Sequence, residues 1–176
     1  KFFRYNQIKD KVGWNSLGVL QMLNVKYIIS QQDLSHPAFK IVFSGELFHQ
    51  GKYQKTNVYQ FRNFMPRAFF VDTLQNISEN DLQLQSLRKS DFNPITSSFV
   101  EHDPQDIEYN ADAEVEIIYW SPDKIEFNLN APSKQFMVLS EIFYPEGWKI
   151  TSHPDWEIYP VNIILRGVYI PSGNHR

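Results

Sequence analysis

Hydrophobic and polar residues alternate in the last third of the chain with the period of two that is typical of a half-buried strand. Residues 114–119 and residues 125–130 both carry this alternation. Between them, Pro122 brings a fixed φ angle and Asp123 favours a turn. The pattern predicts an antiparallel hairpin.

Further strands are expected at the short spacing that is typical of a β-sandwich. They comprise residues 135–141, 148–152, 156–161 and 163–170. Pro-Glu-Gly at 145–147 and Pro-Ser-Gly at 171–173 are typical of type I turns. A strand should return after the second turn, but only residues 174–176 remain. We therefore expect the last strand to be missing and residues 168–176 to form the least ordered edge.

The first hundred residues mix helical and extended patterns. Apolar residues at helical spacing predict a helix over residues 16–23 with Asn15 as its N-cap. Ser78, with Asp81 three residues later, predicts a second capped helix that ends near Arg88. Strands are expected at residues 25–29, 39–43, 46–49, 56–61, 68–71 and 97–101, with a turn at 50–52. Because residues 68–71 are uninterruptedly apolar, we expect both faces of that strand to be covered.

A segment rich in Pro, Asp and Asn, residues 93–110, separates the two patterns, and the expected boundary lies near Pro104. The predicted fold class is α+β, mainly β. A mixed α+β subdomain over residues 1–104 is followed by an antiparallel β-sandwich module over residues 105–176, which is truncated before its last strand.

Composition and charge narrow the classes of function. Apolar residues make up 42% of the chain, and 14 Phe, 9 Tyr and 4 Trp suit a folded, sheet-rich protein. Seventeen basic and twenty acidic residues give a net charge of −3 without a concentrated basic cluster, which excludes a nucleic-acid partner. The chain has no cysteine, so disulfides and thiolate metal sites are excluded.

Motifs for catalysis are absent from the sequence. The five histidines show no metal-ligand spacing, and neither a Gly-x-Ser-x-Gly elbow nor a phosphate-binding glycine loop occurs. Glu114 and Glu116 share one strand face, which is most simply a solvated face rather than half of a glycosidase pair. Asp103, Asp106 and Glu108 lie in a loop that favours solvation over a Ca²⁺ site. We predict no catalytic residue, no metal site and no cofactor.

Two tryptophans and one arginine are the candidates for binding. Trp148 and Trp156 could stack against sugar rings, although large aromatic residues in a small β module more often fill its core. Arg166 lies on a predicted strand and could bind a carboxylate or phosphate with its planar fork of donors. The alternative is a structural ion pair with Glu141 or Glu157.

Three blocks of the chain resemble the YfhO family of bacterial membrane proteins. Residues 144–149, Asn162 and residues 166–175 resemble that family's Tyr-Tyr-Pro-Gly-Trp-Lys block, its Asn-x-x-x-Arg-Gly-Val run and its Pro-Ala-Gly-x-His corner. Upstream, residues 23–29 (Leu-Asn-Val-Lys-Tyr-Ile-Ile) resemble its Leu-Gly-Val-Lys-Tyr-Val-Ile, and residues 65–70 (Met-Pro-Arg-Ala-Phe-Phe) its Leu-Pro-Arg-Ala-Phe.

This chain also departs from the family pattern. Glu146 is inserted between Pro and Gly, Phe143 replaces a Tyr, and His-Pro-Asp at 153–155 stands where the family usually has a short Asp-Gly turn. Residues 75–112 match nothing in the pattern. These departures affect the expected geometry of the loops more than the resemblance to the family.

The resemblance implies a large extracytoplasmic domain of a polytopic bacterial membrane protein, tethered by transmembrane segments outside this sequence. Family members resemble GT-C type glycosyltransferases, which transfer sugar from a polyprenyl-phosphate donor and carry their acidic catalytic residues in the membrane portion. The implied function is that of a non-catalytic accessory domain of cell-envelope biosynthesis. Its implied partners are the rest of the same membrane protein and a cell-envelope glycan or lipid-linked sugar.

The family motif assigns candidate binding roles to Tyr144, Trp148, Asn162 and Arg166. One alternative is a carbohydrate-binding β-sandwich module that uses Trp148, Trp156 and Arg166. A third hypothesis is an independent hydrolase built on a carboxylate pair, and no motif supports it.

Overall fold

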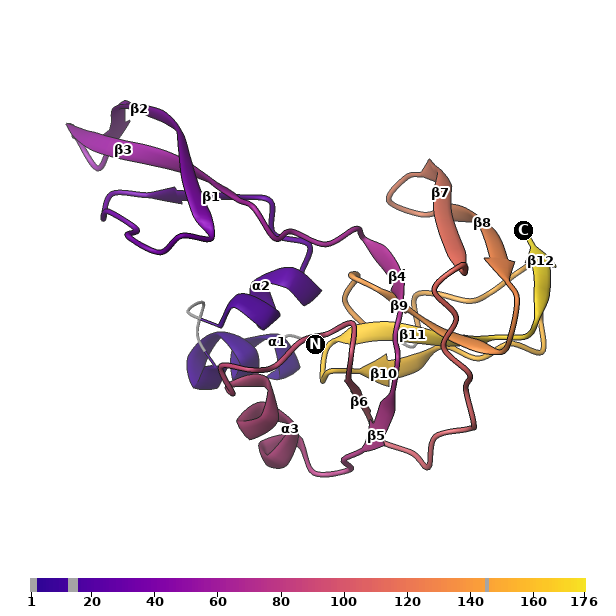
Figure 1. Cartoon of the computed structure of the whole chain (residues 1–176). Helices are drawn as coiled ribbons and strands as arrows, with labels where there is room; N and C mark the ends of the chain where they lie inside the picture. Colours follow the sequence, from indigo (N-terminus) through magenta and orange to yellow (C-terminus); the bar gives the residue numbers. More distant parts are fainter. Residues whose placement is uncertain (1–2, 13–15, 145) are drawn as a thin grey trace.

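Three β-sheets and a layer of short helices make up the computed structural model, which describes residues 3–12, 16–144 and 146–176 (Figure 1). The prediction of a mainly β protein is confirmed. The longest described helix has eight residues, and none of the described helices is long and apolar enough to cross a membrane.

The first sheet is an antiparallel ribbon that projects away from the rest of the molecule (Figure 1). Its strands, in the order β1-β3-β2, are β1 (Tyr27–Ser30), β3 (Lys52–Phe61) and β2 (Phe39–His49). The predicted turn is confirmed, because Gln50 and Gly51 both have positive φ angles (49° and 79°), as a two-residue type I′ turn requires. The two strands expected at residues 39–43 and 46–49 form the single strand β2.

The second sheet has six strands and forms the centre of the molecule. In spatial order they are β4 (Ala68–Phe70), β9 (Gln135–Leu139), β11 (Leu165–Ile170), β10 (Tyr159–Val161), β6 (Ser98–Val100) and β5 (Leu74–Asn76). Neighbours are antiparallel except for β5 and β6, which are parallel. Strands from both sides of Pro104 therefore lie in one sheet. All of β4 is buried, with Phe69 in one hydrophobic cluster and Ala68 and Phe70 in another, so the predicted cover on both faces is confirmed.

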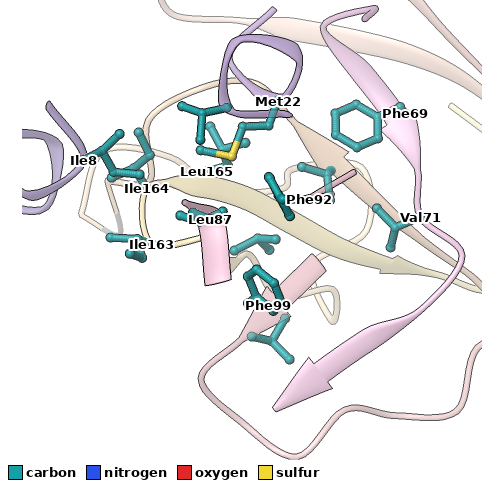
Figure 2. Packing of buried hydrophobic residues seen from close by; sticks show 14 of the residues in the cluster. Ile8, Met22, Phe69, Val71, Leu87, Phe92, Phe99, Ile163, Ile164 and Leu165 are labelled. Atoms are coloured by element: carbon teal, nitrogen blue, oxygen red, sulfur yellow. The ribbon is translucent and has the colours of Figure 1, made fainter. Parts of the chain in front are cut away.

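Helices cover one face of the central sheet. They are α1 (Phe3–Gln7), the π-helical turn η1 (Ile8–Val12), α2 (Leu17–Met22) and α3 (Asn80–Leu87). Figure 2 shows Ile8, Met22 and Leu87 from these elements packed with Phe69 and Phe99 of the sheet. This cluster is the larger of the two cores beside the central sheet.

The helix starts differ from those that the sequence predicted. Ser16 caps α2, and its hydroxyl accepts a hydrogen bond from the backbone N of Val19 at 3.4 Å. Asn15, the expected cap, lies outside the described residues. The cap of α3 is Glu79 rather than Ser78, and its side chain makes no capping hydrogen bond.

The third sheet lies against the opposite face of the central sheet. Its order is β12-β8-β7, with β7 (Glu114–Trp120), β8 (Ile125–Ala131) and β12 (Gly173–His175). The predicted β7–β8 hairpin is confirmed, and the Ser121 hydroxyl closes its turn by accepting from the backbone N of Lys124 at 3.1 Å. Leu129 and Ala131 of β8 share a hydrophobic cluster with β4, β9 and β11.

Three sequence predictions about the C-terminal strands are wrong. Residues 148–152 are loop: Ile150 packs against the hydrophobic cluster, and the backbone of these residues pairs with no described strand. The return strand expected to be missing is present as β12, in which Gly173 pairs with Ala131. Val168 and Ile170 do not lie at an edge of the sheet, because β11 pairs with β9 on one side and with β10 on the other. All residues of β11 are buried.

Candidate binding site

A cavity of about 510 Å³ opens between β8, the neighbouring face of β9 and β11, and the loop of residues 147–158. Phe127, Leu129, Met137, Val168 and Ile170 form much of its apolar wall. Small-molecule sites have volumes of roughly 300–1,000 Å³ and combine an apolar lining with a few polar groups. The cavity fits that description.

The alternation along β11 decides which of its side chains reach the cavity. Successive side chains of a strand point to opposite faces of the sheet, so Arg166 shares one face with Val168 and Ile170. All three line the cavity, while Tyr169 belongs to the core on the helical side. A charged residue is thereby placed at the end of an otherwise apolar wall.

Arg166 is a nearly buried cation, with 6% of its surface exposed. Its Nε donates to the backbone O of Ile142 at 3.0 Å, and its Cζ lies 4.4 Å from the centroid of the Trp148 ring. Burial lowers the pKa of Arg166, and the negative charge of Glu141 opposes that shift. An arginine stays protonated under ordinary conditions, so the site holds a fixed positive charge.

The structural ion pair considered for Arg166 is not formed. Glu141 pairs instead with Arg67 at 2.7 Å, and Glu157 accepts a hydrogen bond from the Tyr159 hydroxyl at 2.8 Å. No ion pair of Arg166 is found among the described residues.

The two candidate tryptophans both line the cavity and are both half-buried. Trp156 stacks on His153, with ring centroids 4.1 Å apart and an interplanar angle of 16°, and the ring of His175 meets its edge at 5.1 Å. Trp156 also packs against the hydrophobic cluster beneath the third sheet. It therefore contributes to the core and keeps part of its surface at the cavity.

Further charged side chains line the cavity, and the sequence prediction missed them. Lys124 and Arg176 lie 2.5 Å and 3.8 Å from the carboxylate of Glu126, and Lys149 follows Trp148 in the loop. The hydrogen bond from Lys124 is the largest cause that lowers the pKa of Glu126. These residues are scattered along the sequence, so no local pattern could have indicated that they share one cavity.

Two residues of the family motif lie outside the cavity lining. Asn162 is fully buried in the turn between β10 and β11, where its Oδ1 accepts from the backbone N of Phe99 and its Nδ2 donates to the Ser98 hydroxyl. Tyr144 is half-buried, with its ring against Gly147. The structure thus brings Trp148, Trp156 and Arg166 together and places Tyr144 and Asn162 elsewhere.

The other polar clusters and the second hollow have fewer features of a binding site than the cavity. The His102 ring lies against the Tyr159 ring at a tilt of 32° with centroids 4.4 Å apart, and its Nε2 lies 3.1 Å from the Tyr169 hydroxyl. A second hollow of about 430 Å³ follows α3 and has no aromatic lining. Within residues 3–12, 16–144 and 146–176, no three His, Asp or Glu side chains are grouped so as to hold a metal ion.

Comparisons with known proteins leave the family assignment open. The resemblance to the YfhO family rests on the sequence blocks at residues 23–29, 65–70 and 144–175 and remains a prediction. A scan against protein-family models, a search of curated proteins and a search of solved structures find no match to this chain.

Proposed function

We propose that this chain is a non-catalytic binding domain that holds a saccharide in the cavity between β8, β11 and the loop of residues 147–158. One observation carries the proposal: Trp148 and Trp156, from the loop of residues 147–158, and Arg166, from β11, line the same cavity. Aromatic faces stack against the C–H patches of sugar rings, and the polar edges of such side chains and an arginine can bind hydroxyl groups.

The setting that we propose for this domain follows from the sequence blocks. It is an extracytoplasmic accessory domain of a polytopic bacterial membrane protein that resembles the lipid-linked-sugar glycosyltransferases of cell-envelope biosynthesis. Its partners would then be the rest of the same membrane protein and a cell-envelope glycan or lipid-linked sugar. The sequence of the full gene tests this setting, which requires about a dozen apolar segments of about 20 residues each.

The proposal includes a finer description of the architecture. We interpret residues 105–176 as an antiparallel β-sandwich and residues 1–104 as a mixed α+β part that precedes it. Support comes from the hydrophobic cluster in which β8 packs against β9 and β11, and β4 of the first part joins the same sheet. The cavity would then be the open end of that sandwich.

Calorimetric titration of the chain with soluble oligosaccharides from bacterial cell envelopes tests the proposed function. We expect binding that weakens about tenfold or more in Trp148→Ala and in Trp156→Ala, because each change removes a stacking face. Trp120→Ala is a matched control, since the Cζ of Arg67 lies 4.9 Å over the Trp120 ring outside the cavity. Absence of binding, or an equal loss in Trp120→Ala, would overturn the proposal.

A further inference from the structure

We infer that the ligand of the cavity carries an anionic group, a carboxylate or a phosphate, which binds the guanidinium group of Arg166. This inference rests on the proposed saccharide site and names the chemical class of its ligand. The site would accordingly prefer an acidic or phosphorylated sugar to a neutral sugar of the same size.

Arg166 is a nearly buried cation, and the negative charge of Glu141 acts on it without forming an ion pair. Only 6% of its surface is exposed, and no carboxylate of the described residues forms an ion pair with it. Removing a cation from water is unfavourable unless an anion or several hydrogen bonds compensate for it. A ligand anion would supply the missing compensation.

The chain contains two arginine–tryptophan pairs that can be compared with each other. Arg67 lies over Trp120 and Arg166 lies over Trp148, with centroid distances of 4.9 Å and 4.4 Å. Arg67 holds a carboxylate of the chain itself, that of Glu141, at 2.7 Å. The pair in the cavity lacks an equivalent partner, although it is the more deeply buried of the two.

The two terminal amino groups of Arg166 remain as hydrogen-bond donors for a ligand. Its Nε is used by the backbone O of Ile142, and no described residue accepts a hydrogen bond from its two terminal amino groups. The Trp148 ring lies beside the guanidinium group, with its centroid 4.4 Å from Cζ. A planar fork of donors fixed in this way matches the two oxygens of a carboxylate or phosphate.

The charged residues that line the cavity also favour an anionic ligand. The whole chain has a net charge of −3, whereas the cavity lining contains four basic residues and only two acidic ones. Of those two, Glu126 is neutralised by Lys124 and Arg176. A cavity with an excess of positive charge between apolar walls concentrates anions at its entrance.

The test compares charged and neutral ligands of the same size by calorimetric titration. One pair is a uronic-acid disaccharide and the neutral disaccharide of the same linkage, and the other is a hexose 1-phosphate and the free hexose. We expect at least one charged ligand to bind about tenfold or more tightly than its neutral partner, and this preference should weaken at high salt. Whichever pair shows the preference identifies the carboxylate or the phosphate as the natural anion.

Variants assign the preference to one side chain. Arg166→Gln should abolish the preference, Arg166→Lys should keep part of it, and the matched control Arg67→Gln should leave it unchanged. An unfolding titration of each variant shows whether its fold is intact. If Arg166→Gln does not fold, the side-chain Nε–H resonance of Arg166 in the wild-type chain gives the answer: it should shift with the charged ligand, while that of Arg67 should not.

The outcomes separate the inference from the function on which it rests. Equal binding of charged and neutral sugars, still weakened by the Trp148 and Trp156 substitutions, would overturn the anionic ligand and leave the saccharide site standing. Absence of binding by every ligand would overturn both. A preference that survives Arg166→Gln would also overturn the assignment to Arg166.

Discussion

Asn162, through its side chain and its backbone N, forms a reciprocal pair of hydrogen bonds with the backbone of Phe99. The backbone N of Phe99 donates to Asn162 Oδ1 at 2.8 Å, and the backbone N of Asn162 donates to the Phe99 O at 2.9 Å. Asn162 has a φ angle of +48°, in the left-handed region that Asn adopts more readily than most residues. The pair therefore ties the turn between β10 and β11 to the middle residue of β6.

Replacing Asn162 by Ala should destabilise the fold strongly. The change leaves the buried backbone N of Phe99 without its acceptor and adds strain at the positive φ angle, so we expect a loss of about 1–3 kcal/mol. Urea unfolding measures the loss, with Asn174→Ala at an exposed position as the control. Equal unfolding midpoints for the two variants would contradict a structural role for the Asn162 side chain.

Gly167 should tolerate no larger side chain. A Cβ atom at this position would overlap the ring of Phe136 and the side chain of Val161, both buried. Gly167→Ala should therefore cost about 1–3 kcal/mol in the free energy of unfolding. Gly51→Asn is the control, because the Gly51 position is open and its positive φ angle suits Asn. If both variants unfold at the same urea concentration, the packing around Gly167 is looser than described.

His102 should make stability depend on pH in the acidic range. Burial lowers the pKa of His102, and the nearby charges of Asp103, Glu101 and Glu157 oppose the shift. An unfolded histidine titrates near pH 6.5, so between that pH and the lower pKa of the folded state the unfolded chain binds more protons. The contribution of His102 to the free energy of unfolding is therefore fully present above about pH 6.5. It is lost as the pH falls from there through the pKa of the folded state.

Urea midpoints measured between neutral pH and about pH 5 check this prediction. The midpoint of the wild-type chain should fall with pH, and His102→Gln should remove part of that fall. A histidine resonance of His102 that titrates above pH 6.5 would contradict the stated direction.

Glu157 should control the ionisation of Tyr159. The hydrogen bond from the Tyr159 hydroxyl to Glu157, followed by burial and the Glu157 charge, raises the pKa of Tyr159 to about 12. Glu157→Gln should lower that pKa toward the ordinary value near 10, which an ultraviolet titration of tyrosinate can follow. In the wild-type chain the contribution of Tyr159 to stability is present below about pH 10 and falls as pH rises toward 12. An unchanged alkaline titration in Glu157→Gln would show that burial alone raises the pKa.

Local patterns in the sequence were sufficient for the elements whose neighbours are close in the chain. The β7–β8 hairpin follows from the alternation of residues 114–130 and the turn at Ser121, because both partners and the turn lie within one short segment. The cover on both faces of β4 follows from its uninterrupted apolar run. In both cases the residues that determine the structure are close together in the sequence.

The assembly of the central sheet depends on contacts that no short segment contains. Val161 of β10 pairs with Val100 of β6, and β5 pairs in parallel with β6 across the whole of α3. The sequence predicts a strand at residues 148–152, whereas in the folded chain this segment is a loop in which Ile150 packs on the core and Trp148 contacts Arg166. The sequence suggested a shared site for Trp148, Trp156 and Arg166, but it gave no sign that Lys124 and Arg176 line the same cavity.

The most direct test of the saccharide site is a nuclear magnetic resonance titration that follows the indole N–H signals of the tryptophans. Trp148 and Trp156 line the cavity, and Trp120 lies outside it. Addition of a uronic-acid disaccharide or a hexose 1-phosphate that binds should shift the Trp148 and Trp156 signals together, with one common affinity, and leave Trp120 in place. A binding ligand that shifts Trp120 and leaves Trp148 and Trp156 unchanged would contradict the site.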